Sequence, residues 1–290
     1  MNSADWQWPA PAKLNLFLHI TGRRADGYHL LQTVFQFIDY SDTIRYHPRA
    51  DGSIRRLSEL AGVPAELDLV VRAAELLRRH VGIDSGIGIE VTKRLPMGGG
   101  LGGGSSDAAT TLVALNAIWR CGLSVDTLAA LGLQLGADVP VFVRGHAAWA
   151  EGVGEQIVPV TLPEPWFVVV VPDAHVETRQ IFNASDLTRN KHPIKIRDFL
   201  EGPTENVCQS LVSSNYPEVA KALEWLAQFG QARMTGTGAC VFAAFPTERA
   251  ALDAAERKPA GWQVIVAKGL NENPLRVMLR QYQAACAQSQ

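Results

Sequence analysis

The sequence predicts a mixed α+β protein, and three observations lead to that prediction. Residues 12–20 alternate between two faces, which is the period of a β-strand. Ala108, Leu112, Leu115 and Trp119 follow one another at spacings of four, three and four, which is one face of an α-helix. Glycine occupies six of the seven positions from 98 to 104, between these elements. At 290 residues and 47% hydrophobic content, one large or two moderate domains are expected.

Composition excludes several classes of protein. The 27 basic and 29 acidic residues are well mixed and leave a net charge of −2, so no nucleic-acid partner and no membrane surface is expected. The longest apolar run, 167–171, is too short to span a bilayer. The first residues contain no hydrophobic signal core, so no export is expected. The cysteines lack zinc or CxxC spacing, which favours reduced thiols and a cytoplasmic location: they are Cys121, Cys208, Cys240 and Cys286.

The first half of the chain is expected to alternate strands and helices. Strand 12–20 is predicted to be half-buried, with Lys13 and Asn15 pointing the same way from its polar face. A turn at 23–27 precedes Tyr28 and His29. The remaining expected elements are a strand ending at 42–46, a helix at 69–81, a strand at 87–91 and a helix at 124–135.

The glycine run leads directly into a helix. Ser105, Ser106 and Asp107 suit the first turn of that helix, and Gly122 is a plausible stop. A helix N-terminus carries unpaired N–H groups and about half a positive charge, so the pattern predicts a phosphate site. A Walker A loop is excluded because its lysine is absent, and a dinucleotide loop because no second strand with its acid follows. A flexible linker is the remaining alternative.

The second half repeats the mixture of strands and helices. A hairpin is expected from 145–150 and 156–160, then a strand at 166–171. Residues 177–185 are ambiguous, and 189–203 is polar and partly looped. A helix at 216–229 precedes a second, smaller glycine loop at 233–240. The expected end is a strand at 241–245, a helix at 248–257, a strand at 262–267 and a helix at 274–287.

Several strings resemble the motifs of one family. Residues 95–109, Leu-Pro-Met-Gly-Gly-Gly-Leu-Gly-Gly-Gly-Ser-Ser-Asp-Ala-Ala, resemble the phosphate loop of the GHMP small-molecule kinases, which include galactokinase, homoserine kinase and mevalonate kinase. Pro-Ala-Lys-Leu-Asn-Leu at 11–16 is similar to the first motif of that family, and 233–240 to the third. Gly-Ala-Asp-Val-Pro at 136–140 matches the motif of the catalytic aspartate.

The resemblance implies a two-domain α+β fold and a kinase activity. The domains would be a ribosomal-protein-S5-like, ATP-binding one at 1–162 and a ferredoxin-like one at 163–290, with the site between them. The co-substrate would be ATP with Mg²⁺. The Gly27-Tyr28-His29 triplet and the extended glycine loop are most similar to members acting on a cytidine-diphosphate-linked methylerythritol. The implied reaction phosphorylates its 2-hydroxyl, in the non-mevalonate isoprenoid precursor pathway.

The resemblance also assigns roles to residues. Asp138 would be the general base, and Lys13 would keep it ionised. Ser105 would also face the magnesium ion. The ATP phosphates would be held by Pro96, Met97, Gly98, Gly99, Gly100, Leu101, Gly102, Gly103, Gly104, Ser105 and Ser106. The acceptor would be held by Asn15, Tyr28, His29, Phe182, Gly236, Thr237 and Gly238, with Tyr28 and Phe182 stacking on cytosine and His29 bonding its edge. Asp68 stands where the family commonly has asparagine, which argues against a direct adenine contact there.

Other interpretations stay open at this point. From residues alone, Lys13 and Asn15 would lie on the solvated face of an edge strand, Asp138 would cap a short helix, and 233–240 would be a tight turn. Rival functions are another kinase of the family, such as homoserine kinase, and a non-catalytic nucleotide or sugar sensor. An RNA-binding module has little support because no basic patch is present.

Overall fold

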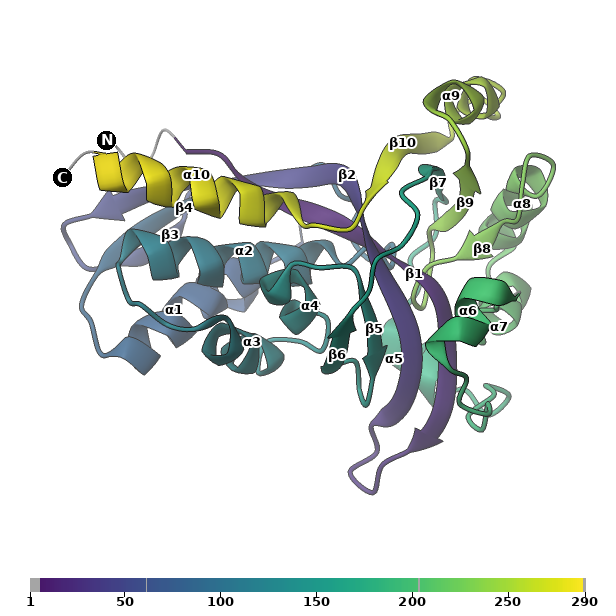
Figure 1. The fold of residues 1–290 in the computed structure, drawn as a ribbon, viewed down its shortest axis with the longest axis horizontal. Coiled ribbons are helices and arrows are strands. Elements are labelled where there is room, and N and C mark those ends of the chain that lie inside the picture. The colour runs from purple at the N-terminus through teal and green to yellow at the C-terminus, as the bar shows by residue number, and fades with distance from the viewer. Residues whose placement is uncertain (1–5, 61, 203, 289–290) are drawn as a thin grey trace.

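Two long antiparallel strands run through the molecule and connect its two halves (Figure 1). The computed structural model describes residues 6–60, 62–202 and 204–288. The two strands are β1 (Trp8–Arg23) and β2 (His29–Arg49). β1 is buried on both faces through most of its length, so the predicted half-buried strand is wrong. Its polar face is covered because the two glycine loops pack against it.

Helices gather beside the strands of the first half, and the expected α+β mixture is present (Figure 1). The predicted helix at 69–81 is α1, with Asp68 as its N-cap. The helix after the glycine run begins at Gly103, so Asp107 lies in its second turn and does not cap it. The elements of this half are β3 (Ile54–Arg56), η2 (Ala65–Leu67), α1 (Leu69–Val81), β4 (Gly86–Thr92), α2 (Gly103–Ile118), α3 (Val125–Leu133), α4 (Val139–Arg144), β5 (Ala148–Glu151) and β6 (Gln156–Pro159).

The second half contains the predicted strand at 166–171 and a helix in the ambiguous stretch 177–185. Helices at 196–201 and 209–215 were not predicted; both are short and lie in polar sequence. The elements are β7 (Trp166–Val171), α5 (Thr178–Asn183), α6 (Ile196–Glu201), α7 (Gln209–Asn215), α8 (Pro217–Leu226), β8 (Arg233–Met234), β9 (Val241–Phe245), α9 (Glu248–Glu256), β10 (Gln263–Leu270) and α10 (Pro274–Gln288).

β10 joins the sheets of the two halves. Its residues 263–268 pair with β7, and Gly269 and Leu270 pair with Ile38 and Phe37 of β2. The described strands therefore form one path, β3-β4-β2-β10-β7-β9-β8. β1 and β5 pair with β2 beside this path, and β6 pairs with β5. A small buried cluster sits at this junction and includes Leu14, Leu95, Leu101 and Cys240. It brings β1 and both glycine loops to one place.

The last helix returns to the first half of the chain (Figure 1). Leu275 of α10 is buried in the same core as Trp8, Leu77 and Leu112. The predicted boundary between residues 162 and 163 stays a prediction, and α10 packs across it. No helix in the described residues is long and apolar enough to cross a membrane.

Candidate active site

The two glycine loops face one cavity of about 580 Å³. Lys13, Asn15, Asp138 and Phe182 line it, together with the glycine run 96–105 and with Gly236 and Thr237 of the second loop. The structure thus brings together most of the residues predicted for the site. Ser106, Gly238, Tyr28 and His29 do not line this cavity.

Close packing within the protein requires glycine at two positions of the run, Gly100 and Gly102. Gly100 has φ +75°, and an added Cβ would lie 2.3 Å from the Thr235 carbonyl oxygen. Gly102 has φ +75° and leaves space for the ring of Phe142. A side chain at Gly100 would separate the two loops, and one at Gly102 would collide with Phe142 and Lys13. The glycines therefore do more than expose backbone to a ligand, which was the sequence-based reason for expecting them.

The α2 N-terminus lies at the end of this run. Its N-cap is Gly102, which offers no side-chain cap, and the first N–H groups of a helix have no acceptor within the helix. Ser105 lines the cavity beside them. Ser106 is fully buried, and its hydroxyl has no hydrogen-bond partner among the described residues. The geometry therefore favours Ser105 over Ser106 for a phosphate contact, which remains a prediction for both.

Lys13 is the centre of the buried polar group. Only 2% of the residue is exposed, and Nζ lies 3.3 Å from Oδ2 of Asp138. Nζ also donates to the Gly100 carbonyl at 3.0 Å and to Oδ1 of Asn15. All three N–H bonds thus have acceptors, so the ammonium is held in one position. The solvated-face alternative for Lys13 and Asn15 is wrong.

Asp138 is the N-cap residue of α4, but its side chain makes no capping hydrogen bond. The capping alternative therefore fails. About a third of the side chain is exposed, toward the cavity. A carboxylate held against a buried ammonium, with an oxygen open to the cavity, is suited to accept a proton from a bound hydroxyl.

Asn15 positions Lys13. Its amide Nδ2 donates to the Thr33 hydroxyl at 2.9 Å, which fixes Oδ1 toward the lysine. The direct substrate contact predicted for Asn15 stays a prediction.

Thr235 was not singled out from the sequence, although it lies within the predicted loop 233–240. Its hydroxyl accepts from the Asn15 N–H at 2.9 Å and donates to the Gly100 carbonyl at 3.3 Å. Asn206, also missed, donates to the Met234 and Gly236 carbonyls at 2.8 and 2.7 Å. Both contacts join segments far apart in the chain, and no local pattern carries that information.

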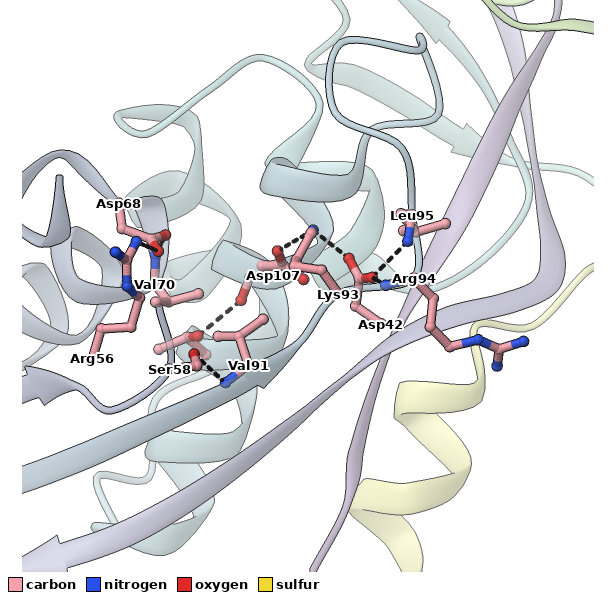
Figure 2. Close-up of polar contacts among 11 residues, drawn as sticks. Asp42, Arg56, Ser58, Asp68, Val70, Val91, Lys93, Arg94, Leu95 and Asp107 are labelled. Carbon is pink, nitrogen blue, oxygen red and sulfur yellow. Dashed lines mark hydrogen bonds and ion pairs between the residues drawn. The ribbon is translucent and has the colours of Figure 1, made fainter. Parts of the chain in front are cut away.

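A buried charged cluster supports the phosphate loop from below (Figure 2). Asp42 is fully buried and accepts from the backbone N–H groups of Arg94 and Leu95 at 2.5 and 2.8 Å. Lys93 bridges Asp42 to Asp107 of α2, with Nζ 2.8 Å from Oδ2 of Asp107. The lysine therefore ties together the two ends of the loop.

Asp107 is the carboxylate of this cluster whose pKa is raised. Burial raises its pKa to about 7; Lys93 opposes that shift and the charge of Asp42 adds to it. Its Oδ1 has no partner among the described residues. Two carboxylates thus share one lysine next to the cavity.

Both carboxylate oxygens of Asp68 are bound by other groups of the protein (Figure 2). Oδ1 accepts from the Val70 N–H at 3.1 Å, and Oδ2 pairs with Arg56 at 2.7 Å. Asp68 also lines the cavity, and the expectation that it makes no direct adenine contact stays a prediction.

The residues expected to hold cytosine are arranged differently from the prediction. Tyr28 is 64% exposed and has no ring contact among the described residues. Phe182 instead stacks on His29, with ring centroids 5.1 Å apart and planes 20° apart. Nε2 of His29 accepts a hydrogen bond from Nε of Arg189 at 3.1 Å. The cytosine contacts of all three residues stay predictions.

The described residues hold no group of three or more His, Cys, Asp or Glu that could bind a metal. Magnesium is commonly held by one or two protein oxygens, with phosphate oxygens and water completing its shell. The Ser105 hydroxyl and the Asp138 carboxylate line the same cavity, so the donor set fits that mode.

Known proteins match this chain over most of its length. The model of the GHMP kinases N terminal domain matches residues 68–146, and that of the GHMP kinases C terminal domain matches 186–261. The 4-diphosphocytidyl-2-C-methyl-D-erythritol kinase of Nitrosococcus oceani is 61% identical over 91% of this chain and 94% of its own length. The protein of the same name from Halorhodospira halophila is 54% identical over 95% and 97%.

Solved structures agree. A crystal structure of 4-(cytidine 5'-diphospho)-2C-methyl-D-erythritol kinase superposes with a TM-score of 0.81 and 32% identity, over 91% of this chain and 98% of that chain. The Methanococcus jannaschii mevalonate kinase superposes with a TM-score of 0.68 and 16% identity, over 91% and 98%, which shows a shared fold.

Proposed function

This chain belongs to the GHMP kinase family, and from that premise we propose that it phosphorylates the 2-hydroxyl of 4-diphosphocytidyl-2-C-methyl-D-erythritol, with ATP as donor. The products are the 2-phosphate and ADP, in the non-mevalonate route to isoprenoid precursors. The chain is a small-molecule kinase. The observation that carries the proposal is the Lys13–Asp138 pair, which lies between the two glycine loops and opens into their shared cavity.

Asp138 would act as the general base. As the acceptor oxygen attacks the γ-phosphorus, the hydroxyl proton passes to the carboxylate, and the bond from the γ-phosphorus to the β,γ-bridging oxygen breaks to release ADP. Lys13 would hold the carboxylate in one orientation because its other N–H bonds are anchored to Gly100 and Asn15. General-base help of this kind is worth roughly a hundred- to ten-thousand-fold in rate.

The α2 N-terminus and the glycine run would hold the phosphates. The unpaired N–H groups of the first turn, with the helix dipole behind them, favour an anion there. Magnesium, when bound, neutralises phosphate charge, and Ser105 would hold it through its hydroxyl. The cytoplasmic location expected from the cysteines remains a prediction.

A turnover assay tests the proposal. The purified chain with ATP and magnesium should phosphorylate the cytidyl acceptor, while homoserine under the same conditions should not be phosphorylated. Turnover of homoserine alone would replace the proposal by the rival kinase. ATP binding without turnover of either compound would favour a non-catalytic sensor.

A further inference from the structure

Arg189 lies between α5 and α6 and organises the loop around Phe182. Its Nη2 donates to the carbonyls of Phe182 and Ala184 at 2.9 and 2.5 Å, and Nη1 donates to the Leu187 carbonyl at 3.2 Å. Among the described residues no carboxylate forms an ion pair with it. The mechanism above does not use this guanidinium, yet four of its hydrogen bonds converge beside the predicted acceptor site.

The fourth hydrogen bond of Arg189 determines which ring nitrogen of His29 carries the hydrogen. A guanidinium only donates hydrogen bonds, so Nε2 of His29 must be the acceptor in the 3.1 Å contact from Nε of Arg189. A neutral imidazole with an acceptor at Nε2 carries its hydrogen at Nδ1. His29 is only 8% exposed and its ring is held flat against Phe182. Both the tautomer and the orientation of the ring are therefore set by neighbours.

The ring is also kept neutral. Burial lowers the pKa of His29, and the positive charges of Arg189 and Arg23 lower it further. These two arginines are the charged groups that act on the ring. Protonation would place a hydrogen on Nε2 directly against the Arg189 N–H, so the contact itself opposes it.

Nδ1 of His29 has no hydrogen-bond partner among the described residues, and its N–H is left for a ligand. A fixed N–H donor complements an acceptor atom. N3 of cytosine is an acceptor, whereas N3 of uracil carries a hydrogen. A ring locked in this tautomer accordingly suits a cytosine edge and conflicts with a uracil edge.

We propose that Arg189 is a positioning residue that locks His29 as the Nδ1–H tautomer and thereby sets a preference for cytosine over uracil in the acceptor. The inference rests on the proposed function, since it concerns the nucleobase of that acceptor.

Steady-state kinetics with matched cytidyl and uridyl acceptors test the proposal. In Arg189→Met, KM for the cytidyl acceptor should rise roughly three- to tenfold, as expected for one hydrogen bond. The preference for cytidyl over uridyl should fall by a similar factor, because His29 can then change tautomer. kcat and the KM for ATP should stay nearly constant. Arg189→Lys should restore part of the preference, since an ammonium also donates to Nε2.

Arg197→Met is the matched control. Arg197 lies on α6, is 71% exposed at its side chain, and among the described residues forms an ion pair with Asp198 only. It should leave both acceptor KM values unchanged. In Arg189→Met, the preference for the cytidyl acceptor should return in part below a pH of about 6.5, where an ordinary histidine protonates and again carries a hydrogen on Nδ1, while the preference of the unaltered enzyme should not change.

Nitrogen-15 spectra of the imidazole, assigned with His29→Asn, read the tautomer directly in the unaltered protein. An Nε2–H signature, or an unchanged cytidyl preference in folded Arg189→Met, would overturn the proposal. If Arg189→Met fails to fold, Arg189→Lys and the spectra decide. No turnover of the cytidyl acceptor by the unaltered enzyme would instead refute the proposed function, and the tautomer would still be measured.

Discussion

The two ends of the candidate site differ in how complete they are. At the phosphoryl-transfer end, Lys13 and Asn15 are at most 5% exposed, and the lysine has an acceptor for each N–H. At the end predicted for cytosine, Tyr28 is 64% exposed and Nδ1 of His29 is unpartnered among the described residues. The charged groups proposed to act in the reaction are thus fixed before a ligand arrives, whereas the end proposed to bind the base has donors and ring faces that only a ligand would cover.

The largest expected effect lies at the complete end. Asp138→Asn keeps the size of the side chain but removes the proton acceptor, so kcat should fall by roughly two to four decades. The free energy of unfolding should fall by about 1–3 kcal/mol, because Lys13 loses its partner while Asp138 is itself partly exposed. Rates with saturating substrates and urea unfolding measure the two effects.

Two further variants test whether Asp138 acts together with Lys13 and whether loss of any ion pair has the same effect. Lys13→Met should also lower kcat, and the double variant should lose less than the product of the single losses, since the residues act as a unit. Asp126→Asn removes an exposed ion pair with Arg144 and should change neither quantity measurably. A folded Asp138→Asn protein with near-normal kcat would leave positioning alone to explain catalysis.

The next effect is on the phosphate loop. An added Cβ at Gly103 would lie 3.3 Å from Leu95 and 3.5 Å from Nζ of Lys93, so a valine there would push the first turn of α2 away from these supporting residues. Gly103→Val should raise the KM for ATP by about tenfold or more, equivalent to at least about 1.4 kcal/mol. Gly230→Ala is the control for a glycine change away from the site, because its φ is not positive and an added Cβ would lie no closer than 3.7 Å to another atom. Unchanged ATP affinity in folded Gly103→Val would rule the loop out as the phosphate site.

A smaller effect, on binding of the acceptor, is expected at the end of the site predicted for cytosine. Tyr28→Ala should weaken binding of the cytidyl acceptor by about 1–3 kcal/mol, the usual contribution of a base stacked on an aromatic ring. Because Tyr28 is exposed and makes no ring contact among the described residues, its removal should leave the protein's stability unchanged. Titration calorimetry with each substrate separates the sites, and a loss on ATP instead would mean that the two binding sites had been exchanged.

The last expected effect is on stability rather than on activity, and it concerns Asp107, which supports the glycine run through Lys93. The folded pKa of Asp107 is raised to about 7, so the folded state holds a proton that the unfolded state releases between about pH 4 and pH 7. This contribution to stability is complete below about pH 4 and is lost as pH rises through about 7. Urea unfolding between pH 5 and pH 8 should show the decrease, and Asp107→Asn should remove that component. Identical pH profiles for the two proteins would contradict it.

Local patterns were sufficient for elements whose signal is contained in adjacent residues. The helix Leu69–Val81 and the strand Trp166–Val171 were predicted with the observed bounds. The grouping of Lys13, Asp138 and the glycine run was also expected, but from the resemblance, because no spacing rule joins residues 125 positions apart.

Contacts between distant segments explain what was missed. The burial of both faces of β1 depends on loops near residues 100 and 235. The role of Thr235 depends on Asn15 and Gly100, and that of Asp107 on a lysine it shares with Asp42. The contact of Phe182 with His29, which the sequence did not indicate, joins residues 153 positions apart, and the stacking of Tyr28 and Phe182 on cytosine stays a prediction. None of these partners lies close in the sequence.

The return of α10 to the first half has a consequence for how the protein is made. Trp8, near the start of the chain, is fully buried, and its ring lies 5.3 Å from that of Tyr282, near the end. Synthesis proceeds from the N-terminus, and domains that close early can fold while the ribosome is still working. Here the core of the first half stays incomplete until α10 has been synthesised. That core therefore cannot close until Leu275 and Tyr282 have left the ribosome.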